Sequence, residues 1–303
     1  MTAHPKPMAA SIASRVQFHL NGRSVQLDRR IHAVRGDLAD FALAGVLFAP
    51  HYARAEAMHV DASGAFVREK ASSISTAVSQ LLQGETFHLL DVTGDWAWGF
   101  CGHDGYVGYV ERSALGTGAL VATHQIAAIV APVFAQPDIK SPVRSTLPCA
   151  AQVAGEVDGD FLSTADGFLH MRHVTPVGRF ETDWVSVAER YLGQPYVWGG
   201  RGLGGLDCSG LVQIALGLCG RKVPRDTDLQ RDGIGEPISE GTPLMRGDLI
   251  FFPGHVGFMI DDALLLHANA HHMTTVIEPL ADVVQRLAPT HDQPIVARRR
   301  IKV

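Results

Sequence analysis

Apolar and polar residues alternate in short runs near the start of the chain. Residues 16–20 and 24–27 alternate on either side of Asn21-Gly22, a dipeptide that favours a tight two-residue turn, and they predict a β-hairpin. Residues 38–48 carry apolar side chains at helical spacing, with Leu38, Phe41 and Ala42 on one side, and they predict a short helix. We therefore expect residues 1–50 to form an N-terminal extension made of a hairpin and a helix.

Two stretches of short strands with regular turns follow, over residues 51–118 and 119–178. Both contain a Gly-Glu turn and, further on, a turn that reads Asp-Gly-aromatic: Gly84-Glu85 with Asp104-Gly105-Tyr106, and Gly155-Glu156 with Asp166-Gly167-Phe168. Short strands with such a repeated layout predict two related all-β modules, each a small barrel. Both stretches resemble bacterial SH3-like domains.

Beyond a linker at Pro176 and Gly178, helices join the pattern. An amphipathic helix is predicted over residues 184–192 and a second over residues 209–218, where Gly220 is placed to end it. Alternating segments over residues 248–269 and a last one over residues 295–303 predict antiparallel strands. Helices followed by strands make residues 179–303 an α+β domain.

Composition and charge narrow the class of protein. The 303 residues are 46% hydrophobic and 19% charged, an ordinary globular balance that excludes wholesale disorder. A net charge of −5 gives no basic footprint for nucleic acid, and no apolar run approaches the roughly 20 residues that cross a bilayer. The N-terminus lacks the continuous apolar stretch of a secretory signal, so we expect a cytoplasmic protein with neither nucleic acid nor membrane as partner.

Cys208 is the cysteine placed for chemistry. The four cysteines lie far apart without a Cys-x-x-Cys pair, so neither a zinc knuckle nor a disulfide framework is indicated. Cys208 follows a glycine-rich loop and begins the helix predicted over residues 209–218, where free amides and the helix dipole favour a thiolate. Cys101, Cys149 and Cys219 are interpreted as small buried hydrophobic residues.

His255 and His267 are the candidate bases for this thiol. They lie in two strand-like segments separated by a turn at Asp261-Asp262. A two-residue loop would place them on opposite faces of the hairpin, whereas a three-residue loop or a bulge would place both on one face, at roughly 5–8 Å. In the second case one histidine could accept the thiol proton while the other orients it. No carboxylate or thiolate completes a metal site with His267 and its neighbours, so we expect neither a metal nor a cofactor.

Three separated motifs resemble those of the NlpC family of cysteine peptidases: PYVWGGRGLGGLDCSGL at residues 195–211, GDLIFFPGHVGFMI at 247–260 and LLLHAN at 264–269. The resemblance covers about the last 120 residues and implies a papain-like α+β fold after the two SH3-like barrels. It implies that Cys208 is the nucleophile, His255 the general base and His267 the residue that orients His255. The backbone amide of Cys208 and a second donor would form the oxyanion hole.

The whole architecture resembles cytoplasmic γ-D-glutamyl-L-diamino acid endopeptidases of cell-wall peptide recycling. That resemblance implies that Tyr196 and Asp207 help to hold the free amine of an N-terminal L-Ala, with Ser209 as a polar neighbour and Asp226 as a further candidate. It also implies that the first SH3-like module closes one end of the groove, and Glu85 and Tyr106 are its candidate contributions. The residues alone leave open that Asp207 only caps the helix and that Tyr196 belongs to the core.

We therefore expect a cysteine endopeptidase that cuts the bond between γ-D-Glu and a diamino acid in peptidoglycan stem peptides with a free N-terminal L-Ala. The alternatives are an exported peptidase or amidase that remodels intact peptidoglycan, and a non-catalytic protein that binds wall fragments. The presence of Cys208, His255 and His267 together argues against the non-catalytic alternative.

Overall fold

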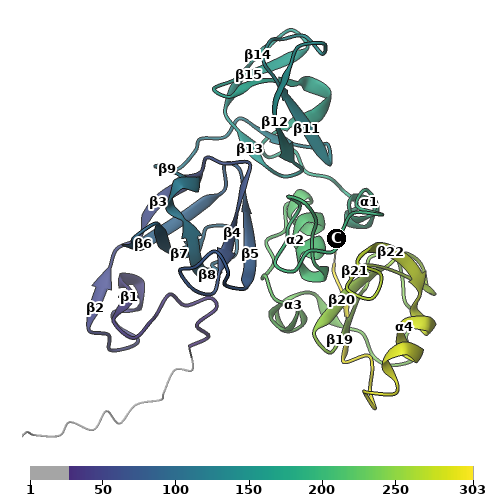
Figure 1. The fold of residues 1–303 in the computed structure, drawn as a ribbon. Coiled ribbons are helices and arrows are strands. Elements are labelled where there is room, and N and C mark those ends of the chain that lie inside the picture. The colour runs from purple at the N-terminus through teal and green to yellow at the C-terminus, as the bar shows by residue number, and fades with distance from the viewer. Residues whose placement is uncertain (1–26, 303) are drawn as a thin grey trace, which may run out of the picture.

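The structure, a computed structural model, describes residues 27–302. Figure 1 shows three lobes: a β-rich lobe in purple and blue, a second β-rich lobe in teal, and an α+β lobe in green and yellow. The hairpin predicted around Asn21-Gly22 lies outside the described residues. Among the helices of the described residues, none combines the length and apolar character needed to cross a membrane.

The helix predicted over residues 38–48 does not form. Strand β1 (Leu38–Asp40) pairs in parallel with β2 (His51–Ala53), and a single 3-10 turn, η1 (Phe41–Leu43), follows β1. The Asp40 carboxylate accepts a hydrogen bond from the backbone N–H of Ala42, which fixes the turn. Leu38 packs against the cluster of Ala33, Leu90 and Trp98, whereas Phe41 and Phe48 are 45% and 86% exposed, so the apolar residues of this segment do not share one buried helical face.

The first β unit is a seven-stranded sheet in the order β5-β4-β8-β7-β6-β3-β9, with the 3-10 turn η2 (Arg112–Ala114) before its last strand. Its core is apolar and fully buried, with Val60, Val67 and Phe87 at its centre. The N-terminal extension packs on its outer side through Ala33, against Trp98 and Leu90. The strands are β3 (Glu56–Val60), β4 (Gly64–Arg68), β5 (Ala77–Leu82), β6 (Thr86–Thr93), β7 (Trp96–Cys101), β8 (Val107–Glu111) and β9 (Leu115–Thr117).

The second β unit has two smaller sheets, in the orders β12-β11-β16-β15-β14 and β13-β10-β17. It is a strand-rich region, and its likeness to an SH3 domain stays a prediction. The strands are β10 (His124–Ile126), β11 (Val130–Phe134), β12 (Val143–Pro148), β13 (Gln152–Val153), β14 (Gly155–Asp158), β15 (Phe161–Thr164), β16 (Gly167–His170) and β17 (Val174–Pro176), with the 3-10 turn η3 (Met171–His173).

The C-terminal lobe packs a buried helix against a six-stranded antiparallel sheet, in the order β18-β23-β19-β20-β21-β22. The central helix α2 buries nearly all of its residues, so it forms the middle of the lobe. The predicted helices and strands of this lobe are therefore present; the first helix and the last strand are shorter than predicted, and the second helix begins one residue earlier. The elements are α1 (Trp184–Glu189), α2 (Cys208–Leu218), α3 (Thr227–Gly233), β18 (Glu236–Pro237), β19 (Leu249–Phe252), β20 (His255–Met259), β21 (Leu264–Asn269), β22 (Thr274–Pro279), α4 (Leu280–Leu287) and β23 (Ala297–Arg300).

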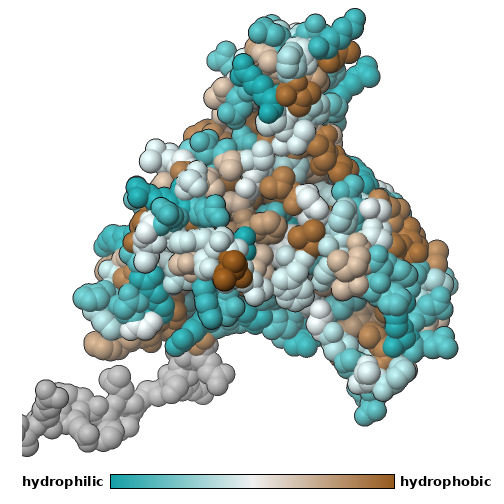
Figure 2. All heavy atoms as spheres, viewed as in Figure 1, coloured by the Kyte–Doolittle hydropathy of each residue, from teal (hydrophilic) through white to brown (hydrophobic). Residues whose placement is uncertain are grey.

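Polar contacts join the first β unit to the loop that precedes α2. The Gln80 side-chain oxygen accepts from the backbone N–H groups of Arg201 and Leu203, at 3.0 and 3.1 Å. Arg201 in turn forms a buried ion pair with Glu85. Figure 2 shows hydrophobic residues in brown and hydrophilic residues in teal mixed together where the lobes meet. The first β unit thus lies directly against the part of the C-terminal lobe that leads to Cys208.

Candidate active site

Cys208 is the first residue of helix α2, as the sequence pattern indicates. Asp207 is the N-cap of this helix, and its carboxylate accepts from the backbone N–H of Gly210 at 2.7 Å. The glycine-rich loop can fold back tightly before the helix because the glycines in it carry no side chains. Gly205 has a φ of +142°, and a Cβ at this position would lie 2.5 Å from the carbonyl oxygen of Pro195.

The Cys208 thiol is buried and protonated rather than ionised. It is 5% exposed, and its sulfur lies 3.8 Å from the hydroxyl of Thr227. Burial and the neighbouring carboxylate of Asp207 raise the pKa of the thiol to about 11, although Thr227 and the backbone of Val256 act in the opposite direction. The thiolate expected from the helix dipole is therefore not the resting state, because burial and the charge of Asp207 both favour the neutral thiol.

His255 and His267 meet on one face of the hairpin. The backbone N–H of Ile260 donates to Leu264, which leaves a three-residue loop, and Phe258 pairs with Leu266. This register places the two histidines diagonally, with Nε2 of His255 2.7 Å from Nδ1 of His267. The structure thus selects the three-residue alternative, and the two-residue loop is wrong.

The histidine pair continues into an ion pair that sequence reasoning missed. Nε2 of His267 lies 2.8 Å from Oε1 of Glu278 on β22, and Arg286 on α4 donates to both oxygens of Glu278. Burial works to raise the pKa of Glu278, but hydrogen bonds from Arg286 and His267 outweigh it and lower that pKa to about 2. The sequence alone did not reveal Glu278, because its position beside His267 depends on how β21 pairs with β22. In that pairing His267 lies opposite Val276.

Both histidines are neutral at neutral pH. Burial, and then the neighbouring His267, lower the pKa of His255 to about 3. Burial lowers the pKa of His267 to about 4, against the opposing effect of Glu278. A neutral His255 has a free ring nitrogen, so it can accept the thiol proton at neutral pH.

A cleft of about 540 Å³ opens beside Cys208. It lies between the C-terminal lobe and the first β unit, where Figure 1 shows α2 and α3 facing β5 and β8. Three parts of the chain therefore enclose one space: the extension, the first β unit and the C-terminal lobe. The lining includes Arg30, Val78, Tyr106, Trp198, Asp207, Cys208, Ser209, Arg225, Asp226, Thr227, Asp228, Arg231, Phe252, Pro253 and Gly254.

Asp207 borders this cleft, but both of its oxygens already have partners. Arg225 donates to Oδ1 and Oδ2 at 2.9 and 2.5 Å, and the backbone N–H of Gly199 donates to Oδ2. Ser209 accepts from the same guanidinium at 2.7 Å. The structure therefore favours the capping role for Asp207 over direct recognition of an amine, and it makes Ser209 part of the same buried network.

Asp226 is a carboxylate of the cleft whose hydrogen bonds and neighbouring charges do not fully offset the effect of its burial. Its Oδ2 accepts from the hydroxyl of Tyr106 at 2.9 Å and from Nη1 of Arg30 at 2.8 Å. Burial nevertheless raises the pKa of Asp226 above its usual value. The structure thus brings together Asp226 and Tyr106, which the sequence analysis had named separately, and adds Arg30, which it had not named.

Glu85 and Tyr196 lie apart from this group. Glu85 is buried outside the cleft, where Arg201 donates to its two oxygens at 2.7 and 3.1 Å, so its expected place in the groove is wrong. Its role is instead to join the first β unit to the loop before Cys208. Tyr196 is half-buried and packs against the core of the C-terminal lobe. Burial raises the pKa of its phenol, and the charges of Cys208 and Asp207 act in the same direction, which places it near the nucleophile.

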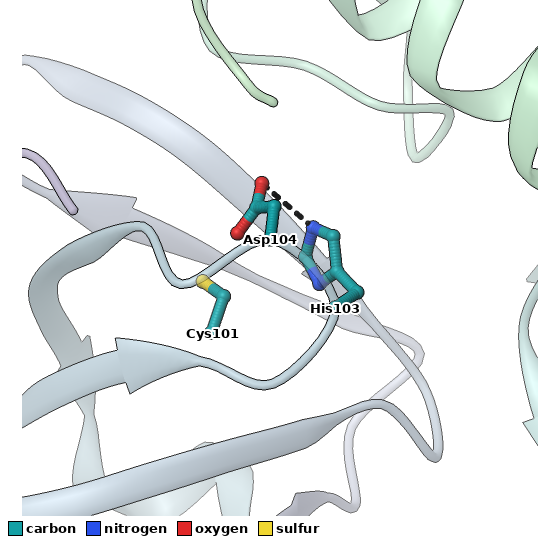
Figure 3. A group of neighbouring side chains, drawn as sticks. All are labelled: Cys101, His103 and Asp104. Atoms are coloured by element: carbon teal, nitrogen blue, oxygen red, sulfur yellow. Dashed lines mark ion pairs between the residues drawn. The ribbon is translucent and has the colours of Figure 1, made fainter. Parts of the chain in front are cut away.

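Within the described residues, one cluster offers three metal-ligand atoms close together: Cys101, His103 and Asp104, shown in Figure 3. Asp104 already accepts from the backbone N–H of Tyr106 at 2.9 Å and from Gln213 of α2 at 2.8 Å, and it lies 3.0 Å from a ring nitrogen of His103. Through these contacts the cluster forms a polar link between the first β unit and α2.

The fold, the buried thiol and the histidine relay define a cysteine peptidase. Residues 193–286 match the NlpC/P60 family, and residues 67–115 match the bacterial dipeptidyl-peptidase Sh3 domain. The chain therefore carries an NlpC/P60 cysteine peptidase domain preceded by a bacterial dipeptidyl-peptidase SH3 domain.

Curated relatives and one solved structure extend this likeness. The chain is 29% identical over 221 residues to dipeptidyl-peptidase 6 of Lysinibacillus sphaericus, a match that covers 63% of this chain and 80% of the relative. It is 32% identical over 107 residues to a γ-D-glutamyl-L-lysine dipeptidyl-peptidase of Bacillus cereus, covering 32% of this chain and 31% of the relative. An NlpC/P60 family protein from Bacillus cereus superposes with a TM-score of 0.68 at 18% identity, covering 80% of this chain and 99% of that one, which supports the shared fold.

Proposed function

We propose that this protein hydrolyses the bond between γ-D-glutamate and a diamino acid in peptidoglycan stem peptides that carry a free N-terminal L-Ala. The observation that carries the proposal is the acidic end of the cleft. Two carboxylates that line it, Asp226 and Asp228, both pair with the guanidinium of Arg30, which also pairs with Asp28 outside the lining. This leaves an excess of negative charge that suits an ammonium group.

The lining of the cleft supports the same substrate. Tyr106 and Val78 of the first β unit and Arg30 of the extension form one wall of it. In intact peptidoglycan the L-Ala nitrogen is a neutral amide that carries a bulky lactyl sugar. That group would leave the acidic end without a cation and would collide with the wall. A peptide released from the sugar fits better, which supports a role in recycling wall peptides. The cytoplasmic location stays a prediction.

The site supports acyl transfer through a thioester. Cys208 Sγ attacks the γ-carbonyl carbon of D-glutamate while its proton passes to His255, and the backbone N–H of Cys208 stabilises the oxyanion. His255 then returns the proton to the leaving amine of the diamino acid. A water molecule, deprotonated by His255, hydrolyses the thioester and restores the thiol.

The test compares L-Ala-γ-D-Glu-diaminopimelate with its N-acetylated form, using mass spectrometry to identify the products. A charged hydrogen bond is worth about 1.5–3 kcal/mol, so acetylation should lower kcat/KM by about 10- to 150-fold. Asp226→Asn should lower kcat/KM for the free peptide and should shrink the penalty of acetylation.

Asp262→Asn is the matched control, because Asp262 is an exposed acid between β20 and β21 and lies outside the lining of the cleft. This variant should behave as the wild type. Equal cleavage of the free and acetylated peptides, or rapid cleavage of whole sacculi, would favour a remodelling enzyme, and an inert protein would favour a wall-fragment binder.

A further inference from the structure

Two neighbours compete for the same ring nitrogen of His267. Glu278 Oε1 lies 2.8 Å from Nε2 of His267, and so does Nδ2 of Asn269. The carboxylate can only accept a hydrogen bond, so it requires a proton on Nε2. The Asn269 amide nitrogen can only donate, so it requires Nε2 to be bare. Asn269 cannot turn around freely, because its oxygen accepts from the backbone N–H of His272 at 2.8 Å.

The outcome of this competition determines whether His255 can act as a base. If Nε2 of His267 carries the proton, Nδ1 of His267 is a bare acceptor. His255 must then donate from its own Nε2 across the 2.7 Å contact, and its Nδ1 stays free to accept a proton. If Asn269 prevails, His267 and His255 each carry the ring proton on Nδ1 instead of Nε2. His255 then carries its proton on Nδ1 and has no free nitrogen to offer the thiol.

We propose that Glu278 is the positioning residue that sets the tautomer of both histidines, and that it does so against Asn269. The proposal rests on the proposed catalytic role of His255. Glu278 has the advantage because it is ionised and a charged hydrogen bond is stronger than a neutral one. Arg286 keeps it ionised and holds it in place by donating to its two oxygens at 2.6 and 3.0 Å.

Glu278 acts through His267 and stays outside the cleft that holds Cys208. Glu278→Ala should therefore lower kcat without a matching change in KM. The expected loss is about 10²–10⁴-fold in kcat, the contribution of a general base, with KM within about threefold of wild type. Glu236→Ala is the matched control, since it removes an exposed acid that pairs with Lys302 on the same sheet and should leave both constants unchanged.

Removal of the competitor gives a result that a purely structural role would not produce. Asn269→Ala alone should change kcat little, because the productive tautomer is already present. In the double variant Glu278→Ala with Asn269→Ala, the Asn269 amide no longer donates to Nε2 of His267, and at least tenfold of the lost kcat should return. A double variant as inactive as Glu278→Ala would overturn the proposal.

The tautomers themselves can be measured without any substrate. Nitrogen-15 NMR of the ring nitrogens in Cys208→Ala protein should show His255 protonated at Nε2, and the added Glu278→Ala change should move that proton to Nδ1. An unchanged ring spectrum would refute the inference. This measurement stands even if the stem peptide proves to be the wrong substrate, so the two proposals fail separately.

Glu278→Gln keeps the test valid if Glu278→Ala does not fold. Glu278→Gln sets a neutral amide oxygen against the neutral amide of Asn269, so the advantage of charge is lost and kcat should fall. Adding Asn269→Ala to Glu278→Gln removes the competitor and should restore at least tenfold of that loss. No recovery in this second double variant would overturn the proposal.

Discussion

The resting state of Cys208 gives a prediction that separates two mechanisms. A cysteine peptidase can rest as a thiolate beside an imidazolium, or as a thiol beside a neutral imidazole. Burial and Asp207 raise the pKa of Cys208 from 9.0 to about 11, which corresponds to about 3 kcal/mol in favour of the thiol. At pH 7 about one molecule in 10⁴ then carries the thiolate, since each pH step below the pKa lowers the ionised fraction tenfold.

Alkylation measures this fraction directly, because iodoacetamide reacts with the thiolate. The rate of Cys208 modification, followed by loss of activity and by intact mass, should rise about tenfold for each pH step between pH 6 and pH 9. Cys219 is the partly exposed cysteine among the four, so the experiment uses a Cys219→Ala background.

A thiolate–imidazolium pair would give a different profile. Its thiolate would be fully formed at neutral pH, and the alkylation rate would be level between pH 5 and pH 8. A level profile would refute the argument that burial and Asp207 favour the neutral thiol at this site. A steep profile together with full activity at pH 7 would mean that the proton leaves the thiol only during the attack.

Three further predictions concern the nucleophile, the bases and the response to acid. Cys208→Ala should abolish product formation in the mass assay, whereas Cys149→Ala should leave it intact; residual hydrolysis by Cys208→Ala would contradict a thiol nucleophile. His255→Ala should lower kcat more than His267→Asn, because asparagine can still hold an imidazole through one hydrogen bond; equal, total loss would show that His267 does more than orient. The free energy of unfolding should fall as the pH drops from about 6.5 towards 3, because unfolded histidines take up protons that His255 and His267 bind only at lower pH in the folded state. Urea titrations in which His255→Gln shows the same loss as wild type would contradict this account.

Local patterns predicted the elements that carry the nucleophile and the first histidine. The apolar stripe that begins after Cys208 predicts a helix, and the structure buries nearly all of its residues. The spacing of His255 and His267 leaves only the length of the loop between their strands to be decided. Both are short-range properties of the chain. The predicted helix over residues 38–48 is wrong for a related reason: its spacing is helical, but Leu38 packs against the first β unit as part of a strand while Phe48 stays exposed.

The partners of the site residues could not be predicted, because they come from distant parts of the chain. Arg30 reaches Asp226 across 196 positions, and Arg201 reaches Glu85 across 116. Neither pairing follows from periodicity, since it depends on how the first β unit docks on the C-terminal lobe. The same limit explains why Asp207 was considered for amine binding: its partner Arg225 lies 18 positions away, beyond the helix that Asp207 caps.

The first β unit has two separate effects on the site, and only one of them is recognition. Tyr106 shapes the acidic end of the cleft, while Glu85 neutralises Arg201, which is 4% exposed in the loop before Cys208. A fragment that begins near residue 182 would lack Gln80 and Glu85, so Arg201 would lose its acid and the loop before Cys208 would lose the contacts that hold it. Loss of activity in such a fragment would therefore report a disordered loop and would say nothing about the substrate. Asp226→Asn and acetylation of the peptide act within the cleft and leave the Arg201–Glu85 pair outside it in place, so they test recognition alone.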